Sequence, residues 1–267
     1  MEDQLILDEQ KAYYRARAHE YDEWFLRQGR YDRGPEHRNE WLGEAAEIEV
    51  ELRSLVRGVD VLELACGTGL WTQRLAEGNR RVTAVDASPE TIAINRARVG
   101  SANVEYHIAD IFSWVPQTTY DVVFFSFWLS HVPPARFEEF WTLVRAALKP
   151  GGQAFFIDSL PEPTSTAKDH GPIDESGVSR RKLNDGREFN IVKVFYEPSV
   201  LERRLAELGW SGWVRSTLPS PTGRSSMKSV TVPPFAGPPP SYLKSMRTRC
   251  VPGGNRSVHS TWNKSTP

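Results

Sequence analysis

The segment 61–69, Val-Leu-Glu-Leu-Ala-Cys-Gly-Thr-Gly, constrains the fold of this chain more than any other. Its first half is a short apolar run, typical of a buried strand, and a glycine turn and a helical pattern over 70–77 follow. Gly67 and Gly69 supply backbone angles that other residues reach only at a cost, and they leave bare main chain for a ligand. Strand, glycine turn and helix open a nucleotide-binding α/β unit, although a glycine turn alone is often only a turn.

Composition indicates one globular domain with appendages. The chain has 267 residues and no apolar run near the roughly 20 residues that cross a bilayer. Its acidic N-terminus lacks the basic segment of a signal peptide, so we expect a cytoplasmic protein without a membrane segment. The two cysteines are Cys66, inside the glycine turn, and Cys250, far downstream, so we expect neither a disulfide framework nor a metal site.

Charge is unevenly distributed along the chain. The formal net charge is −1, but residues 218–267 contain seven Lys or Arg and no Asp or Glu, which leaves −8 on residues 1–217. An acidic folded part disfavours a nucleic-acid partner. Because the segment 218–267 is also rich in Pro and Ser and has no apolar periodicity, we expect it to be a disordered basic tail.

Strand and helix patterns alternate over 57–217, and we expect this domain to follow an N-terminal helical cap or lid over 1–56. The expected strands are 59–64, 81–85, 104–108, 120–126, 153–158, 188–195 and 210–217. The expected helices are 4–30, 36–56, 70–77, 91–99, 134–148 and 198–208, and the polar segment 159–187 is expected to be a long loop. This order predicts an α/β fold with a doubly wound Rossmann-like sheet, mostly parallel with an antiparallel C-terminal edge hairpin.

Acidic residues lie in or just after the first three expected strands: Glu63, Asp86 and Asp110. Ligands of open α/β sheets bind beyond the carboxyl ends of the strands, so these side chains are expected at one edge. Asp86 lies 17 residues after Gly69, near the spacing at which a carboxylate accepts both ribose hydroxyls. Thr72 stands where a dinucleotide fingerprint needs Gly or Ala, which counts against a nicotinamide cofactor.

Five motifs in chain order resemble those of the class I S-adenosylmethionine-dependent methyltransferases. They are Glu63-Leu-Ala-Cys-Gly-Thr-Gly, Asp86-Ala-Ser-Pro, Ala109-Asp110-Ile111, Tyr120-Asp121-Val122-Val123 and Leu148-Lys149-Pro150-Gly151-Gly152. The resemblance covers about 57–217 and implies an enzyme of the EC 2.1.1 class with S-adenosylmethionine as its cofactor.

The resemblance also implies a cofactor site. The glycine turn would hold the methionine part, the acid after strand two the ribose, and the acid after strand three the adenine amino group. Glu63 would accept from the ammonium, and Ala65 departs from the usual Gly. The cofactor-binding residues expected in this way are Glu63, Ala65, Gly67, Gly69, Asp86, Ala87, Asp110, Ile111 and Ser126.

The acceptor side is less constrained. His131, in the segment after strand four, is a candidate base or acceptor-orienting group, with a backbone-bonded loop histidine as the alternative. Candidates for lining an aromatic acceptor pocket, or for holding the sulfonium by cation–π contact, are Tyr14, Tyr21, Trp71 and Trp128; plain core packing is the alternative for each.

We therefore expect methyl transfer to O or N of a small-molecule acceptor. The alternatives are a non-catalytic S-adenosylmethionine-binding protein and a nicotinamide-dependent oxidoreductase on a related fold. The sequence carries no signal for an oligomeric state.

Overall fold

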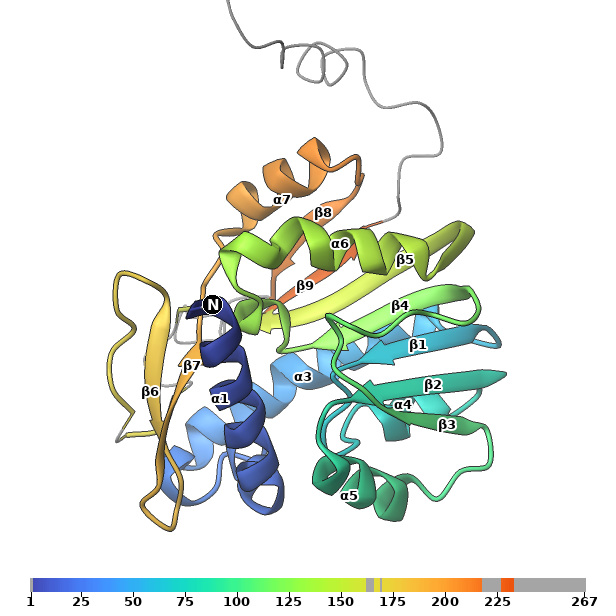
Figure 1. Cartoon of the computed structure of the whole chain (residues 1–267). Helices are drawn as coiled ribbons and strands as arrows, with labels where there is room; N and C mark the ends of the chain where they lie inside the picture. Colours follow the sequence, from blue (N-terminus) through green and yellow to red (C-terminus); the bar gives the residue numbers. More distant parts are fainter. Residues whose placement is uncertain (1, 162–165, 169, 218–226, 233–267) are drawn as a thin grey trace, which may run out of the picture. The chain divides into compact units, whose positions relative to one another are not determined.

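Seven strands form one sheet in the order β3-β2-β1-β4-β5-β9-β8 (Figure 1). The computed structural model describes residues 2–161, 166–168, 170–217 and 227–232. Strands β1 to β5 are parallel, whereas β9 runs antiparallel to both β5 and β8. The strands of the sheet are β1 (Asp60–Leu64), β2 (Arg81–Asp86), β3 (Val104–Ile108), β4 (Tyr120–Ser126), β5 (Leu148–Ser159), β8 (Trp213–Ser216) and β9 (Met227–Val232).

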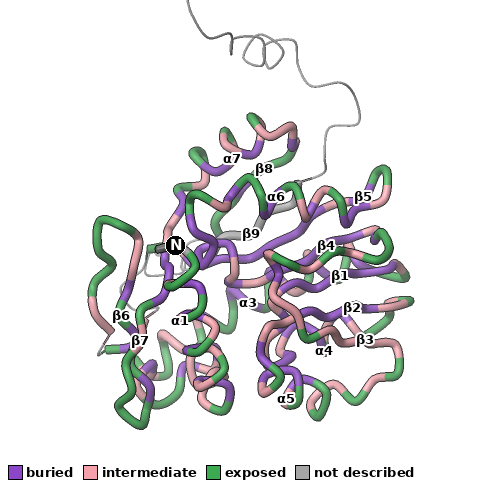
Figure 2. The backbone as a smooth tube through the Cα atoms, in the orientation of Figure 1, coloured by how far each residue is buried: buried purple, intermediate pink, exposed green. Residues whose placement is uncertain are grey.

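Each face of the sheet is covered by its own helices, because side chains alternate between the two faces. Val61 and Phe124 pack with α3 and α4 on one face, and Leu62 and Phe125 pack with α6 and α7 on the other. Figure 2 shows the central strands buried along most of their length. The helices are α3 (Pro35–Leu55), α4 (Thr72–Ala76), α5 (Pro89–Val99), α6 (Phe137–Ala146) and α7 (Pro198–Glu207), with the 3-10 turns η3 (Leu129–His131) and η4 (Pro134–Arg136) after β4.

The N-terminal elements pack against a separate hairpin, β6 (Val178–Lys182) with β7 (Glu188–Val192), as Figure 1 shows for α1 and β7. These elements are α1 (Glu2–Arg17), η1 (Ala18–Glu20), α2 (Tyr21–Phe25) and η2 (Gly29–Tyr31). The Glu9 carboxylate accepts the Asn190 amide at 2.7 Å, and the Gln10 side chain accepts the Val192 amide at 3.0 Å. Side chains of α1 thus accept hydrogen bonds from backbone amides along the outer edge of β7.

The fold class is confirmed, but three expectations about its parts are wrong. The segment 159–187 contains β6 and is not one long loop, and the expected strand 188–195 pairs with β6 outside the central sheet. Residues 227–232, expected in a disordered tail, form β9 between β5 and β8. The buried Glu44 carboxylate of α3 accepts the Met227 amide at 3.0 Å and fixes the start of this strand. The antiparallel edge hairpin is therefore β8–β9.

The remaining residues of the expected tail lie outside the described part of the chain. The domain boundary at 56/57 stays a prediction, whereas β9 places part of the segment after residue 217 in the central sheet. Every helix in the described ranges is either too short or too polar to span a lipid bilayer.

Candidate active site

The turn after β1 contains three left-handed residues: Ala65 at φ 53°, Gly67 at 52° and Gly69 at 90°. A Cβ on Gly67 would meet only Tyr21 Cε1, at the ordinary contact distance of 4.0 Å, so this main chain leaves room for a further group beside it. A Cβ on Gly69 would lie 2.6 Å from Asn95 Oδ1 of α5. Gly67 therefore leaves room for a ligand, whereas Gly69 is required by helix packing, which differs from our expectation.

A cavity opens beyond the carboxyl ends of β1, β2 and β4, at the switch point of the sheet. We call it the cofactor cavity. One face of α1 closes it, with residues at helical spacing: Leu7, Gln10, Lys11 and Tyr14. Seven expected cofactor-binding residues line it: Ala65, Gly67, Asp86, Ala87, Asp110, Ile111 and Ser126.

The two other expected cofactor-binding residues, Glu63 and Gly69, do not line the cofactor cavity, and neither does the acceptor-side candidate Trp71. Glu63 is buried in β1, and this burial raises the pKa of its carboxyl to about 8, with a hydrogen bond from Thr72 acting in the opposite direction. Trp71 is buried against Phe25 and Phe124, at centroid distances of 6.2 and 5.8 Å. Trp71 therefore serves mainly in core packing.

The two acids at the strand ends face the cofactor cavity with different partners. Asp86 Oδ2 accepts the Gly67 amide at 2.9 Å and Oδ1 accepts the Ser88 amide at 2.9 Å. Burial raises the pKa of Asp86 despite these hydrogen bonds. Asp110 Oδ2 forms an ion pair with Lys11 Nζ of α1 at 2.9 Å. The sequence did not indicate Lys11 as a site residue. It lies 99 residues before Asp110 and reaches it because α1 packs over the cofactor cavity.

A second cavity, of about 260 Å³, lies between the N-terminal elements and the β6–β7 hairpin. We call it the cationic cavity, because the buried side chains of Arg17, Arg181 and Lys193 line it. No Asp or Glu occurs among the described residues around it. Four buried polar atoms at its wall have no hydrogen-bond partner within the described ranges: Tyr13 Oη, Arg17 Nε, His170 Nε2 and Ser179 Oγ.

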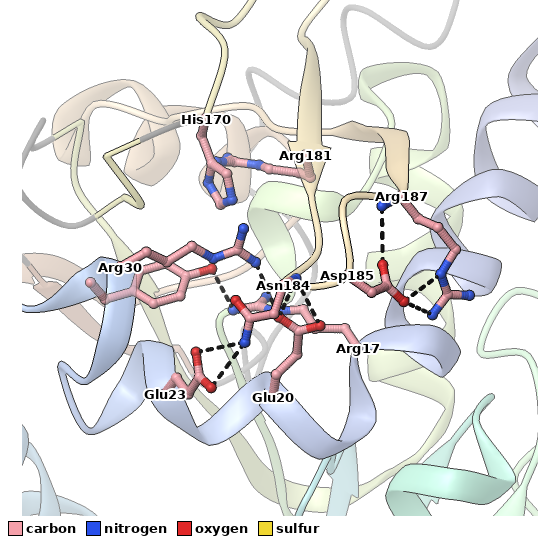
Figure 3. A network of polar contacts seen from close by, with 10 residues as sticks. Arg17, Glu20, Glu23, Arg30, His170, Arg181, Asn184, Asp185 and Arg187 are labelled. Atoms are coloured by element: carbon pink, nitrogen blue, oxygen red, sulfur yellow. Dashed lines mark hydrogen bonds and ion pairs between the residues drawn. The ribbon is translucent and has the colours of Figure 1, made fainter.

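The turn of the β6–β7 hairpin is held on the N-terminal elements beside the cationic cavity (Figure 3). Asn184 donates its amide to Glu20 and its side-chain Nδ2 to Glu23, each at 3.0 Å. Figure 3 also shows His170 beside Arg181. Burial, reinforced by Arg181, lowers the pKa of His170 to about 2, so its ring is neutral.

The wall between the two cavities is formed by Tyr14, Tyr21, Phe127 and His131, which line both. His131 Nδ1 lies 2.7 Å from the Val192 carbonyl, and Nε2 lies 2.9 Å from the Tyr14 hydroxyl. A carbonyl only accepts, so Nδ1 carries the proton and Nε2 accepts from Tyr14. Burial, and then Lys193, lowers the pKa of His131 well below its usual value.

The aromatic candidates therefore differ in which cavities they line. Tyr14 and Tyr21 contact both cavities, whereas Trp128 lines the cofactor cavity alone. The sequence did not indicate Phe127, although it directly follows β4.

Comparison with known proteins agrees with this arrangement. Residues 61–152 match the family model described as a methyltransferase domain. A ubiquinone biosynthesis O-methyltransferase of Xanthomonas oryzae pv. oryzae is 31% identical over 113 residues, 40% of this chain. The match spans 45% of that relative, so the chain spans less than half the length of this curated protein.

Solved structures match over a longer range. The DhpI–SAH complex is 41% identical with a TM-score of 0.68, and the match covers 86% of this chain and 97% of that one. The DhpI–SAM–HEP complex is 40% identical with a TM-score of 0.69, covering 86% and 98%. Since the sequence and the fold agree over nearly the whole of DhpI, the chain belongs to the same family, the class I S-adenosylmethionine-dependent methyltransferases.

Proposed function

We propose that this chain is a methyltransferase that moves the methyl group of S-adenosylmethionine to an oxygen of a small anionic acceptor. The cofactor part rests on the donor set of the cofactor cavity. The open main chain at Gly67 suits a ligand that packs on backbone, and a Cβ would fill that space. Asp86 Oδ2, with one N–H donor recorded on it, retains acceptor capacity for a ribose hydroxyl.

The adenine would lie near Asp110 and Ile111, which also line the cofactor cavity. Asp110 Oδ2 already accepts from Lys11, and a carboxylate oxygen has a second lone pair for an amino group. These residues suit a nucleoside with an amino-acid arm, and the DhpI complexes with SAM and SAH support the choice of cofactor.

The cationic cavity carries the acceptor part of the proposal. Arg17, Arg181 and Lys193 bring three positive charges to one cavity whose described lining contains no Asp or Glu, and a cavity lined by charges of one sign favours a ligand of the opposite sign, here an anion. The unpaired Arg17 Nε and the Tyr13 hydroxyl add donors for its oxygens. An oxyanion is already deprotonated, so its methylation requires no base. This agrees with a neutral His131 whose ring nitrogens are both engaged.

The protein's own contribution would be alignment and the exclusion of water. S-adenosylmethionine supplies an electrophilic methyl group, and the chain holds the acceptor in line with it. α1 contributes residues to both cavities, and the β6–β7 hairpin covers the cationic one. Tyr14 and His131 lie in the wall through which the methyl group would pass.

The size of the cationic cavity favours a small molecule over a polymer. Its volume of about 260 Å³ is close to the lower end of the ~300–1,000 Å³ range of ligand pockets. That the chain has no nucleic-acid partner and is cytoplasmic remain predictions.

The experiment is a binding titration followed by a transfer screen. Isothermal titration calorimetry should show saturable binding of S-adenosylmethionine and S-adenosylhomocysteine and no binding of NADH. Methyl-labelled S-adenosylmethionine is then incubated with carboxylates, sulfonates and phosphoryl compounds, each paired with a neutral amide or alcohol of the same size. We expect label on an anion, identified by product mass.

Other results would contradict parts of the proposal. Label only on neutral or cationic acceptors would refute the anionic acceptor. Cofactor binding without transfer to any compound would favour a non-catalytic binding protein.

A further inference from the structure

Three cavities meet at the carboxyl end of β4. Besides the cofactor cavity and the cationic cavity, a smaller one lies against the glycine turn, between Gly67 and Trp71 on one side and Trp24 and Phe25 on the other. We call it the turn cavity. Two aromatic residues line all three cavities: Tyr21 and Phe127.

Phe127 is held in an unfavourable backbone conformation. Its φ is 53°, a left-handed value that a residue with a Cβ adopts at a cost. Its amide donates to the Ile157 carbonyl at 2.7 Å. Trp41 stacks on the ring at 6.0 Å, and Trp24 meets it nearly perpendicularly at 4.7 Å. The surroundings therefore fix the ring at the junction of the cavities.

Tyr21 reaches the same junction from the N-terminal side. A Cβ on Gly67 would lie 4.0 Å from Tyr21 Cε1, so the ring lies over the glycine turn. The Arg17 guanidinium lies 4.9 Å from the ring centroid. The ring of Tyr21 thus contacts one cation, the Arg17 guanidinium, and also lies beside the glycine turn.

The chemistry of the cofactor matches this junction. The positively charged sulfur of S-adenosylmethionine carries three substituents: the adenosyl group, the amino-acid arm and the methyl group. The acids at the strand ends place the adenosyl group in the cofactor cavity, the glycine turn suits the arm, and the acceptor lies in the cationic cavity. The atom that bears all three belongs where the three cavities meet.

We propose that the rings of Tyr21 and Phe127 flank the sulfonium and bind its positive charge by cation–π interaction. This inference rests on the proposed function. It assigns the contact to one expected residue and to one that the sequence did not indicate, in place of Trp71 and Trp128. An aromatic face attracts a cation through its quadrupole, and the attraction is larger when both groups are shielded from water.

The proposal predicts a difference between the two forms of the cofactor. S-adenosylhomocysteine has the same adenosyl group and arm but no methyl group and no positive charge. Loss of either ring should therefore weaken the binding of S-adenosylmethionine more than the binding of S-adenosylhomocysteine. A change that only alters the shape of the site should weaken the binding of both ligands similarly.

Calorimetry on the full chain measures both dissociation constants for the wild type, Phe127→Leu and Tyr21→Leu. We expect each leucine variant to bind S-adenosylmethionine about 3- to 30-fold more weakly, with a change of about 2-fold or less for S-adenosylhomocysteine. Phe127→Tyr and Tyr21→Phe retain a ring and should retain the ratio of the two constants. Phe112→Leu is the matched control, because Phe112 lines the cofactor cavity alone and its loss should change both constants by the same factor.

A second measurement covers a leucine variant that fails to fold by circular dichroism. Fluorinated phenylalanines at position 127 keep the shape of the ring and weaken its quadrupole, so the S-adenosylmethionine constant should rise stepwise with fluorine number. The inference is overturned if the leucine variants lose affinity for both ligands equally, or if fluorination of residue 127 leaves the S-adenosylmethionine dissociation constant unchanged. A wild type that binds neither ligand instead refutes the proposed function.

Discussion

The hydroxyl of Tyr14 lies 2.9 Å from Nε2 of His131, and the two rings meet edge to face at a centroid distance of 5.5 Å. Tyr14 belongs to the N-terminal helix α1, whereas His131 follows β4, so the pair joins α1 to the central sheet. Val192 of the hairpin accepts from the other ring nitrogen at 2.7 Å. Three separate segments thus fix one neutral imidazole in the wall between the two cavities.

The pH dependence of turnover tests the state of this imidazole. Burial lowers the pKa of His131 well below its usual value, so the ring does not take up a proton near pH 6.5. With a carboxylate acceptor, which is ionised throughout, kcat/KM should show no step near pH 6.5. A step at that pH that disappears in His131→Gln would assign a titrating base to His131 and contradict the proposal.

The Tyr14–His131 contact should also behave as one unit in mutagenesis. Tyr14→Phe and His131→Gln each remove the same hydrogen bond, so we expect each to lower kcat by about 10-fold, the worth of one buried hydrogen bond. The double variant should lose no more than His131→Gln alone, because Tyr14→Phe removes only a hydrogen bond that His131→Gln has already removed. Losses that multiply in the double variant would show that the two side chains act independently.

Neighbouring arginines of β6 test the anionic acceptor. Arg181 is buried at the cationic cavity, whereas Arg180 is exposed and pairs with Glu188. Arg181→Gln should raise the acceptor KM by about 10- to 100-fold, since a hydrogen bond to a charged group contributes about 1.5–3 kcal/mol. The S-adenosylmethionine dissociation constant should stay the same. Arg180→Gln is the matched control, and an equal effect of both variants on KM would contradict the assignment.

The two glycines of the turn should separate packing from binding. Gly69→Ala brings a Cβ to 2.6 Å from Asn95 Oδ1, so we expect a loss of about 2–4 kcal/mol in the free energy of unfolding. The Cβ of Gly67→Ala would contact only Tyr21 Cε1, at 4.0 Å, so this variant should lose about 1 kcal/mol in the free energy of unfolding. It should also bind S-adenosylmethionine more weakly. Urea denaturation and calorimetry measure the two effects. The reverse pattern would contradict this division.

The central sheet and the cofactor edge could be predicted because their signals are local. The apolar runs of β1 and β4 and the acids Asp86 and Asp110 are each read within a few residues. A parallel sheet then brings all carboxyl ends to one edge without further information. Glu63 does not line the cofactor cavity, because side chains alternate along a strand and the buried Glu63 side chain interacts with Thr72 of α4 instead.

The cationic cavity could not be predicted in this way. Arg17 and Arg181 lie far apart in the sequence, and Arg181 is part of a polar segment that has no apolar periodicity. They meet because α1 packs against β7, where Glu9 and Gln10 accept hydrogen bonds from backbone amides of β7. This packing is a tertiary contact. The strand β9 was not predicted for a similar reason, because its pairing is a tertiary contact. Its partner β5 is distant from it in the sequence, and its other partner β8 is very short.

Glu63 gives the last prediction, on stability. Burial raises the pKa of its carboxyl to about 8 in the folded chain, against about 4.3 for a glutamate in the unfolded chain. Between these values the folded state binds more protons, so this group lowers the free energy of unfolding as pH rises, by at most about 1.4 kcal/mol per pH unit. Glu63→Gln cannot ionise and removes this dependence.

The difference in unfolding free energy between Glu63→Gln and the wild type should therefore increase from about pH 5 to about pH 8, by about 2–4 kcal/mol. Urea denaturation at these two pH values measures it. Glu47→Gln, a substitution of an exposed glutamate on α3, is the control and should differ from the wild type by about 0.5 kcal/mol or less at both. A constant difference for Glu63→Gln across this range would show that the Glu63 carboxyl ionises in the folded chain as readily as in the unfolded one.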